Sequence, residues 1–131
     1  MWHGTAWLGM ELVPRGELTY QRGDIRWIRL DPTVGAQIQK TRSCLILQND
    51  IMNQYGQLTI VVPFRPGSKQ APYVVNVKAT PANGLDKDRF LDVAQLRAVD
   101  NQRVLGHLGV LEEHYWQQIR TALDIVLGFA P

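Results

Sequence analysis

Short runs of β-forming residues, separated by Gly, Pro and Asn turns, recur along most of the chain and limit the folds it can adopt. The runs are "DIRWIRL" at 24–30, "SCLILQN" at 43–49, "LTIVVPF" at 58–64, "YVVNV" at 73–77 and "RFLDVAQLRAV" at 89–99. The segment "DNQRVLGHLG" that follows is a bent connector or one more short strand. Short, closely spaced strands with such turns are typical of a small barrel or sandwich.

The last segment follows a different period. In "LEEHYWQQIRTALDIVLG", residues 111–128, apolar residues recur every 3.6 residues on average, which predicts an amphipathic helix. Glu112 and Glu113 would lie in its first turn, where the helix dipole favours anions, and Gly128 would end it. The segment "DIMNQYGQ", between the second and third runs, is predicted as a turn. We therefore expect a mainly β (α+β) fold of five or six strands with a C-terminal helix.

The chain has 131 residues, enough for one domain with a real core. A single cysteine, Cys44, and three scattered histidines offer neither a disulfide framework nor a metal-ligand cluster, so we expect no cofactor. No apolar run is long enough for a membrane span and no signal-peptide pattern opens the chain, which predicts a cytoplasmic protein. Residues 1–20 contain "LVPRG", similar to a thrombin recognition sequence, and form either a cloning remnant or a native N-terminal extension. We expect residues 21–131 to form the single domain.

Positive charge gathers in the first two thirds of the chain. Residues 1–83 hold nine Lys and Arg against five Asp and Glu, whereas residues 84–131 hold five against seven. Two polar segments next to the second and third β runs carry much of it: Gln37, Gln39, Lys40, Thr41 and Arg42 in the first, and Arg65, Ser68, Lys69 and Gln70 in the second. If the two strands are neighbours, these groups converge on a site suited to phosphate. The alternative is ordinary solvated loop.

The order of several motifs resembles a known family. The motifs are Arg22-Gly23-Asp24, Trp27, Asp31-Pro32, Gly35, Lys40, Arg42, Asn49-Asp50, "VVPF" at 61–64, "NGLDKD" at 83–88 and "QLRAVD" at 95–100. Over residues 22–129 this pattern is similar to that of the MazF/PemK toxin endoribonucleases, or mRNA interferases, of toxin–antitoxin systems. The resemblance implies an SH3-like small barrel of the CcdB/PemK type and a cytoplasmic homodimer. It also implies metal-independent cleavage of single-stranded RNA and neutralisation by a cognate antitoxin.

The resemblance also assigns residues. Arg42 matches the family's catalytic arginine, which would stabilise charge that builds on the phosphate. Of the positions that depart from the pattern, two bear most directly on the chemistry: Gln37 stands where the family has Glu, and Arg65 stands where it has a catalytic Thr or Ser. Arg65 could form a two-arginine clamp with Arg42, with Ser68 supplying a hydroxyl nearby. The residues expected to bind RNA are Gln37, Gln39, Lys40, Thr41, Ser68, Lys69 and Trp27.

Two other functions remain open. The departures at Gln37 and Arg65 are also compatible with a catalytically weak or inactive regulator that binds RNA or antitoxin. A gyrase-inhibiting binder similar to CcdB is the third possibility, although the chain ends "LGFAP" without the C-terminal Trp of those proteins. Trp27 has two readings: it could stack on a base, although packing in the core is the commoner role of a strand tryptophan.

Overall fold

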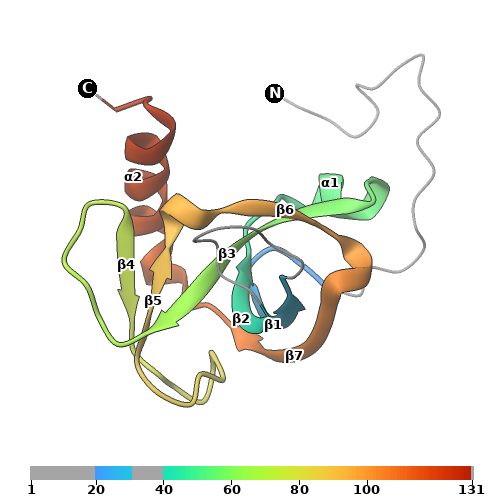
Figure 1. Ribbon diagram of the computed structural model, residues 1–131, viewed down its shortest axis with the longest axis horizontal. Helices are drawn as coiled ribbons and strands as arrows, with labels where there is room; N and C mark the ends of the chain where they lie inside the picture. The colour runs from blue at the N-terminus through green and yellow to red at the C-terminus, as the bar shows by residue number, and fades with distance from the viewer. Residues whose placement is uncertain (1–19, 31–39, 131) are drawn as a thin grey trace.

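The computed structural model describes residues 20–30 and 40–130, and the N-terminal extension therefore lies almost entirely outside the described residues. Seven strands and two α-helices, with short 3₁₀ turns η2 to η4, make up this part of the chain (Figure 1). The elements are β1 (Asp24–Arg29), β2 (Thr41–Ile46), α1 (Asp50–Tyr55), β3 (Leu58–Pro66), β4 (Val74–Val77), β5 (Arg89–Asp92), η2 (Val93–Gln95), β6 (Arg97–Asp100), η3 (Asn101–Arg103), β7 (Val104–Val110), η4 (Glu113–Tyr115) and α2 (Trp116–Leu127).

The strand β3 organises the sheet because it exchanges partners along its length. Its first residues, 58–61, pair with β6, residues 61–63 pair with β2, and residues 64–66 pair with β5. All these pairs are antiparallel, and the strand order is β4-β5-β3-β2-β1-β7 with β6 beside β3. One long, apolar strand therefore holds two differently directed parts of the sheet together, as the diagonal run of β3 in Figure 1 shows.

The core has two parts, one on each face of the sheet. The first, which we call the helix-side core, packs α2 through Ile119 and Ala122 against residues of β2, β3, β4 and β5. The second core gathers Tyr20, Ile28, Leu30, Cys44, Ile46, Val61 and Val99 on the opposite face. Along β3, Val62 and Phe64 belong to the helix-side core and Val61 to the second, which is the alternation expected of a strand buried on both faces.

The expectation of a mainly β fold with a C-terminal helix is confirmed. The helix ends as predicted, with Gly128 in the left-handed conformation at φ 79° and its N–H donating to carbonyls of the last turn. Its start was predicted wrongly, because α2 begins at Trp116 after a 3₁₀ turn. Glu112 precedes that turn and accepts a hydrogen bond from Thr80 Oγ1 at 2.6 Å, so it fastens a loop and does not neutralise the dipole of α2.

Two further expectations of local structure were wrong. The segment at 50–57, predicted as a turn, forms the helix α1, because Asn49 accepts a hydrogen bond from Met52 N and caps the first turn. The single predicted strand at 89–99 is two strands, since η2 interrupts it and β5 and β6 pair with different parts of β3. Within the described residues, no helix is long and apolar enough to cross a membrane.

Candidate phosphate-binding site

The first group of candidate residues lies at the start of β2. Thr41 and Arg42 were expected in a loop, but both are the first residues of the strand. Lys40, just before them, has a φ of 69°, an uncommon value for a residue other than Gly, and its carbonyl accepts a hydrogen bond from Leu30 N at 3.0 Å. Because the main chain is held by β1 on this side, the exposed Arg42 side chain starts from a fixed strand position.

Arg65 occupies the corresponding place near the end of β3. It too was expected in a loop and instead belongs to the strand, paired with Phe90 of β5. Its Nη1 lies 3.4 Å from Oδ2 of Asp92. The position of Arg65 is therefore set by the pairing of β3 with β5 and by its contact with the Asp92 carboxylate.

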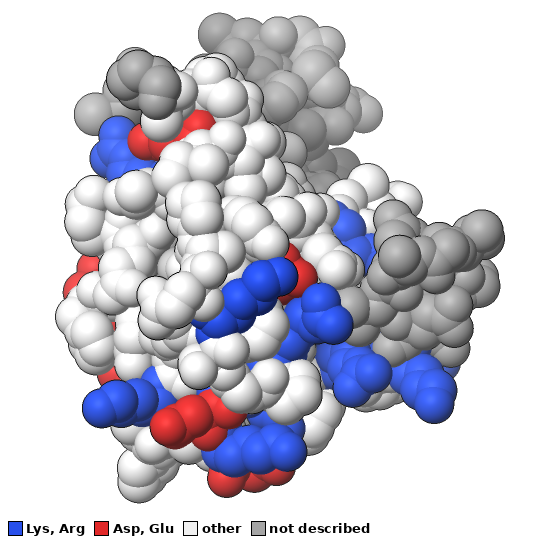
Figure 2. All heavy atoms as spheres, turned by 60° about the vertical axis from the view of Figure 1, so that its left-hand side comes forward, with Lys and Arg blue, Asp and Glu red and all other residues white. Residues whose placement is uncertain are grey.

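The pairing of β2 with β3 places these two arginines at the same end of one ladder. The last pair of that ladder is Cys44 with Pro63, and Arg42 and Arg65 each lie two residues beyond it. Residues that pair across antiparallel strands share a face, and so do residues two apart on one strand. Arg42 and Arg65 therefore leave the sheet on the same face, at the same end of the ladder. Figure 2 shows Lys and Arg side chains gathered on the face that is exposed when the β4 side of Figure 1 is turned forward.

The remaining residues of the second group lie in the β3–β4 connection. Ser68 and Lys69 are exposed there. Lys69 N donates to Asn76 Oδ1 at 3.0 Å and Asn76 Nδ2 donates back to Lys69 O at 3.1 Å, so the loop is fastened to β4. The Lys69 ammonium lies 5.3 Å from the centre of the Tyr73 ring. This loop follows Arg65 directly, so its cation belongs to the same end of the sheet.

The thiol of Cys44 is influenced by the positive charges of two arginines. The thiol is fully buried, and burial raises its pKa. The positive charges of Arg97 and Arg42 oppose that rise, which means that both guanidinium groups act on the same thiol. Arg97 pairs with Val61 across β6 and β3, and Val61 belongs to the second core with Cys44. Arg97 is thus a third cation on the face that carries Arg42 and Arg65, which we call the arginine face.

Sequence reasoning assigned no role to Arg97 or Asp92. Arg97 lies in "QLRAVD", a segment that contributed to the family resemblance, and that was the available signal for it. Asp92 gave no signal, because an acid at the end of a short strand is ordinary until its burial and its partner are known.

Trp27 is placed away from the arginines. It pairs with Ser43, whereas Arg42 pairs with Ile28, and neighbouring residues of a strand point to opposite faces. Trp27 therefore leaves the sheet on the face opposite to Arg42. Its side chain is 42% exposed, so the interpretation as a core residue was wrong. Gln37 and Gln39, the other polar residues expected here, lie outside the described residues.

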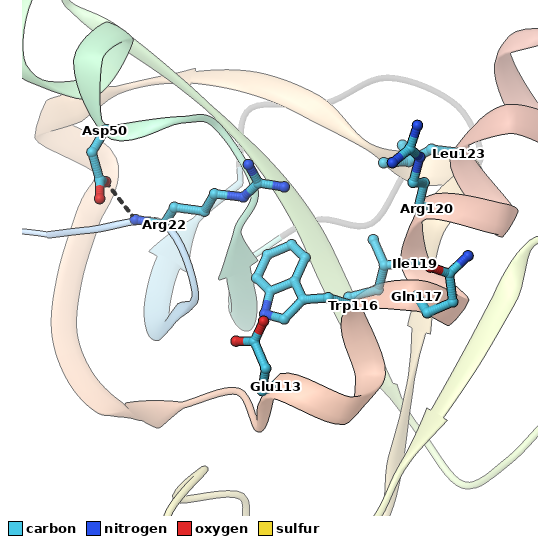
Figure 3. Close-up of a pocket in the computed structure, with 8 residues that line it drawn as sticks. All are labelled: Arg22, Asp50, Glu113, Trp116, Gln117, Ile119, Arg120 and Leu123. Atoms are coloured by element: carbon cyan, nitrogen blue, oxygen red, sulfur yellow. Dashed lines mark hydrogen bonds between the residues drawn. The ribbon is translucent and has the colours of Figure 1, made fainter.

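A separate pocket of about 920 Å³ lies between α2 and the turn before β1. Figure 3 shows its lining: Arg22, Asp50, Glu113, Trp116, Gln117, Ile119, Arg120 and Leu123. The guanidinium of Arg22 lies 4.6 Å from the centre of the Trp116 ring, and Arg22 N donates to Asp50 Oδ1 at 2.7 Å. The pocket shares no lining residue with the arginine face and combines two cations with two acids, so it does not resemble a phosphate site.

Comparison with known proteins identifies the family. Residues 21–127 match the family described as PemK-like, MazF-like toxin of type II toxin–antitoxin system. The chain is 32% identical over 109 residues to the endoribonuclease MazF of Staphylococcus epidermidis, covering 82% of this chain and 91% of the relative. It is 28% identical to the endoribonuclease EndoA of Bacillus subtilis, with 82% and 94% covered.

Solved structures agree on the fold. The chain superposes on MazF from Deinococcus radiodurans with a TM-score of 0.70 at 22% identity, covering 83% of this chain and 96% of that one. A mycobacterial endoribonuclease in complex with its cognate antitoxin gives a TM-score of 0.70 at 18% identity, covering 86% and 99%. The small-barrel fold predicted from the resemblance is confirmed by these structures. By its sequence over residues 21–127 and by its fold, this chain belongs to the family of PemK-like, MazF-like toxins of type II toxin–antitoxin systems.

Proposed function

We propose that the chain is an endoribonuclease toxin that cuts single-stranded RNA at the face carrying Arg42 and Arg65. The observation that supports this most directly is that the two exposed arginines lie at one end of the β2–β3 ladder and on one face. The relatives named above as endoribonucleases support the reaction class. Lys40 and Lys69 flank the arginines along the chain and would bind neighbouring phosphates.

The reaction begins with attack of a ribose 2′-oxygen on the adjacent phosphorus. The bond from that oxygen to phosphorus forms, the bond from phosphorus to the 5′-oxygen breaks, and the products are a 2′,3′-cyclic phosphate and a 5′-hydroxyl. Extra negative charge builds on the phosphate oxygens in between. Arg42 stabilises that charge, since arginine remains protonated and is an electrostatic group, not a proton acceptor. Gln37 offers no base, so the proton of the 2′-hydroxyl passes to solvent, and the departing 5′-oxygen takes up a proton from solvent to give the 5′-hydroxyl.

Several expectations remain part of this proposal. Gln37, Gln39, Thr41 and Ser68 are candidates for contacts with the RNA. Thr41 neighbours Arg42 on β2 and so points to the other face. Trp27 is a candidate for stacking on a base, but on the face opposite to Arg42.

Partners are proposed from the same family membership. One similar structure contains a cognate antitoxin, and another is a MazE–MazF complex from Deinococcus radiodurans. We propose that an antitoxin covers the arginine face, that the toxin acts in the cytoplasm and that it is a homodimer. Ile125 and Leu127 in the last turn of α2 and Phe129 just after it are exposed apolar residues, which we propose for an interface between copies.

The test is to incubate the purified protein with a long RNA of mixed sequence in EDTA and to map the ends. Discrete cuts with 5′-hydroxyl ends are expected, and Arg42→Ala should lower the rate by about 100- to 1000-fold. Arg120→Ala removes an exposed arginine of α2 and is the matched control, which should cut normally. Cleavage by Arg42→Ala at the wild-type rate refutes the mechanism. RNA that is bound but never cut favours a non-catalytic regulator.

A further inference from the structure

Asp92 is a buried acid that the proposed reaction has not yet used. Its side chain is 7% exposed, and its Oδ1 is buried with no hydrogen-bond partner among the described residues. Its other oxygen, Oδ2, meets Nη1 of Arg65 at 3.4 Å. A buried carboxylate with one unpaired oxygen destabilises a fold, and an apolar residue at the end of β5 would avoid that cost. The carboxylate therefore calls for an explanation through its one partner, Arg65.

Strand pairing explains how the two side chains meet. Arg65 pairs with Phe90, and Asp92 lies two residues further along β5 on the same face. This is the diagonal relation between antiparallel strands, which long side chains can span. Asp92 pairs with Val74 of β4, and its neighbour Leu91 pairs with Phe64 of β3, so the main chain at the end of β5 is held in place. The carboxylate is thus a fixed point, and Arg65 is the group that it can orient.

The contact with Asp92 occupies only part of the Arg65 guanidinium. An arginine has five N–H donors, and Nη1 carries the contact with Asp92. The Arg65 side chain is 46% exposed, so the guanidinium is accessible for further contacts beside the one with Asp92. An arginine held at one end and open at the other is suited to bind a phosphate oxygen without first losing side-chain freedom.

We propose that Asp92 is a positioning residue, which holds Arg65 so that its open donors face a phosphate of the RNA. This rests on the proposed function. The Arg65–Asp92 pair would then take the place of the hydroxyl that the family resemblance expects at position 65. We expect no direct contact between Asp92 and the RNA, because its side chain is only 7% exposed.

A competing explanation makes the opposite prediction. If Asp92 only neutralised Arg65, removing its charge would strengthen the attraction of the site for RNA and leave the cleavage rate unchanged or higher. If Asp92 positions Arg65, Asp92→Asn leaves the KM equal or lower, because the charge of Arg65 remains. It lowers kcat by roughly 10- to 100-fold, because the donors are no longer aligned. The division between KM and kcat separates these two roles.

The experiment is a double-mutant cycle on a short RNA that contains one mapped cut site. The proteins are wild type, Asp92→Asn, Arg65→Ala and the double variant. Asp86→Asn is the matched control, since it breaks an exposed Asp–Arg pair, with Arg89 Nη2 at 2.9 Å, away from the arginine face. The proposal expects that Asp92→Asn has little further effect once Arg65 is Ala, because both changes remove one function. Fully additive losses, or a wild-type kcat in Asp92→Asn, overturn it.

A second measurement does not depend on cleavage. NMR relaxation of the Arg65 Nε–Hε group should show a rigid side chain in the wild type and a mobile one in Asp92→Asn, at equal thermal stability. Equal mobility in both proteins overturns the positioning role even if RNA is cut. If the wild type cuts no RNA, the proposed function fails, and the NMR comparison alone decides whether Asp92 holds Arg65.

Discussion

Arg65→Thr restores the residue type that the family resemblance expects after the third strand, and it separates the two explanations of that departure. If Arg65 has drifted in a weakened enzyme, Thr should restore or raise cleavage. If Arg65 and Arg42 form a clamp, Thr removes a preorganised donor and the rate should fall by about 100- to 1000-fold, which is roughly 2.7 to 4 kcal/mol in transition-state stabilisation.

The structure also sets the effect on stability. Arg65→Thr leaves the Asp92 carboxylate buried without its cation, and an unpaired buried polar group costs about 1 to 3 kcal/mol of unfolding free energy. Arg65→Thr combined with Asp92→Asn removes that charge, so it should unfold at a higher temperature than Arg65→Thr alone. The assay is initial-rate cleavage of a single-site RNA, measured well below the unfolding midpoint of each variant. A rate for either variant at or above that of the wild type refutes the two-arginine clamp.

Two predictions concern the loop that joins β4 to β5. Burial raises the pKa of Glu112, but hydrogen bonds from Thr80 and Asn83 outweigh it, so the pKa in the folded protein is lower than usual. The ionised carboxylate therefore stabilises the fold fully above the unfolded-state pKa of about 4.3, and this stabilisation is lost as the pH falls through the lower folded-state pKa. Glu112→Gln should therefore lower the unfolding temperature at pH 7, and the difference from wild type should shrink in acid; a constant difference contradicts this. Gly109→Ala would place a Cβ against the backbone of Asn83, so the free energy of unfolding measured by chemical denaturation should fall by about 1 to 3 kcal/mol. Gly106→Ala on the same strand is the control, because a Cβ has room there. A similar loss of stability in Gly106→Ala would refute the argument.

The sequence predicted what depends on local pattern. The alternation and composition of the β runs located β1, β2, β3 and β4, and the 3.6-residue period located α2 and its end at Gly128. Each of these features depends on which faces of a segment are apolar, and the order of residues within the segment determines this.

What the sequence could not show depends on distant partners. The run at 89–99 looks like one strand, but its halves pair with opposite ends of β3, and nothing within the run reveals this. The exposure of Trp27 has the same origin, because the sequence of the strand does not show whether another element covers the face on which Trp27 lies. Asp92 could not be singled out either, since its importance comes from Arg65, which lies far from it along the chain.

The positions of Arg42 and Arg65 connect the departures at the site into one argument. Both were expected on loops, and both belong to strands. Arg42 pairs with Ile28 of β1 and Arg65 pairs with Phe90 of β5, so each backbone is held by one neighbouring strand. Fixed donors lose little freedom when a phosphate binds, so they act most strongly where charge develops. On the proposed function, a chain with Gln37 where the family resemblance expects Glu, and with a second arginine where it expects a hydroxyl, would rely on electrostatic stabilisation in place of a protein base. The buried Asp92 fits this exchange, because a second arginine contributes only if it is held in place.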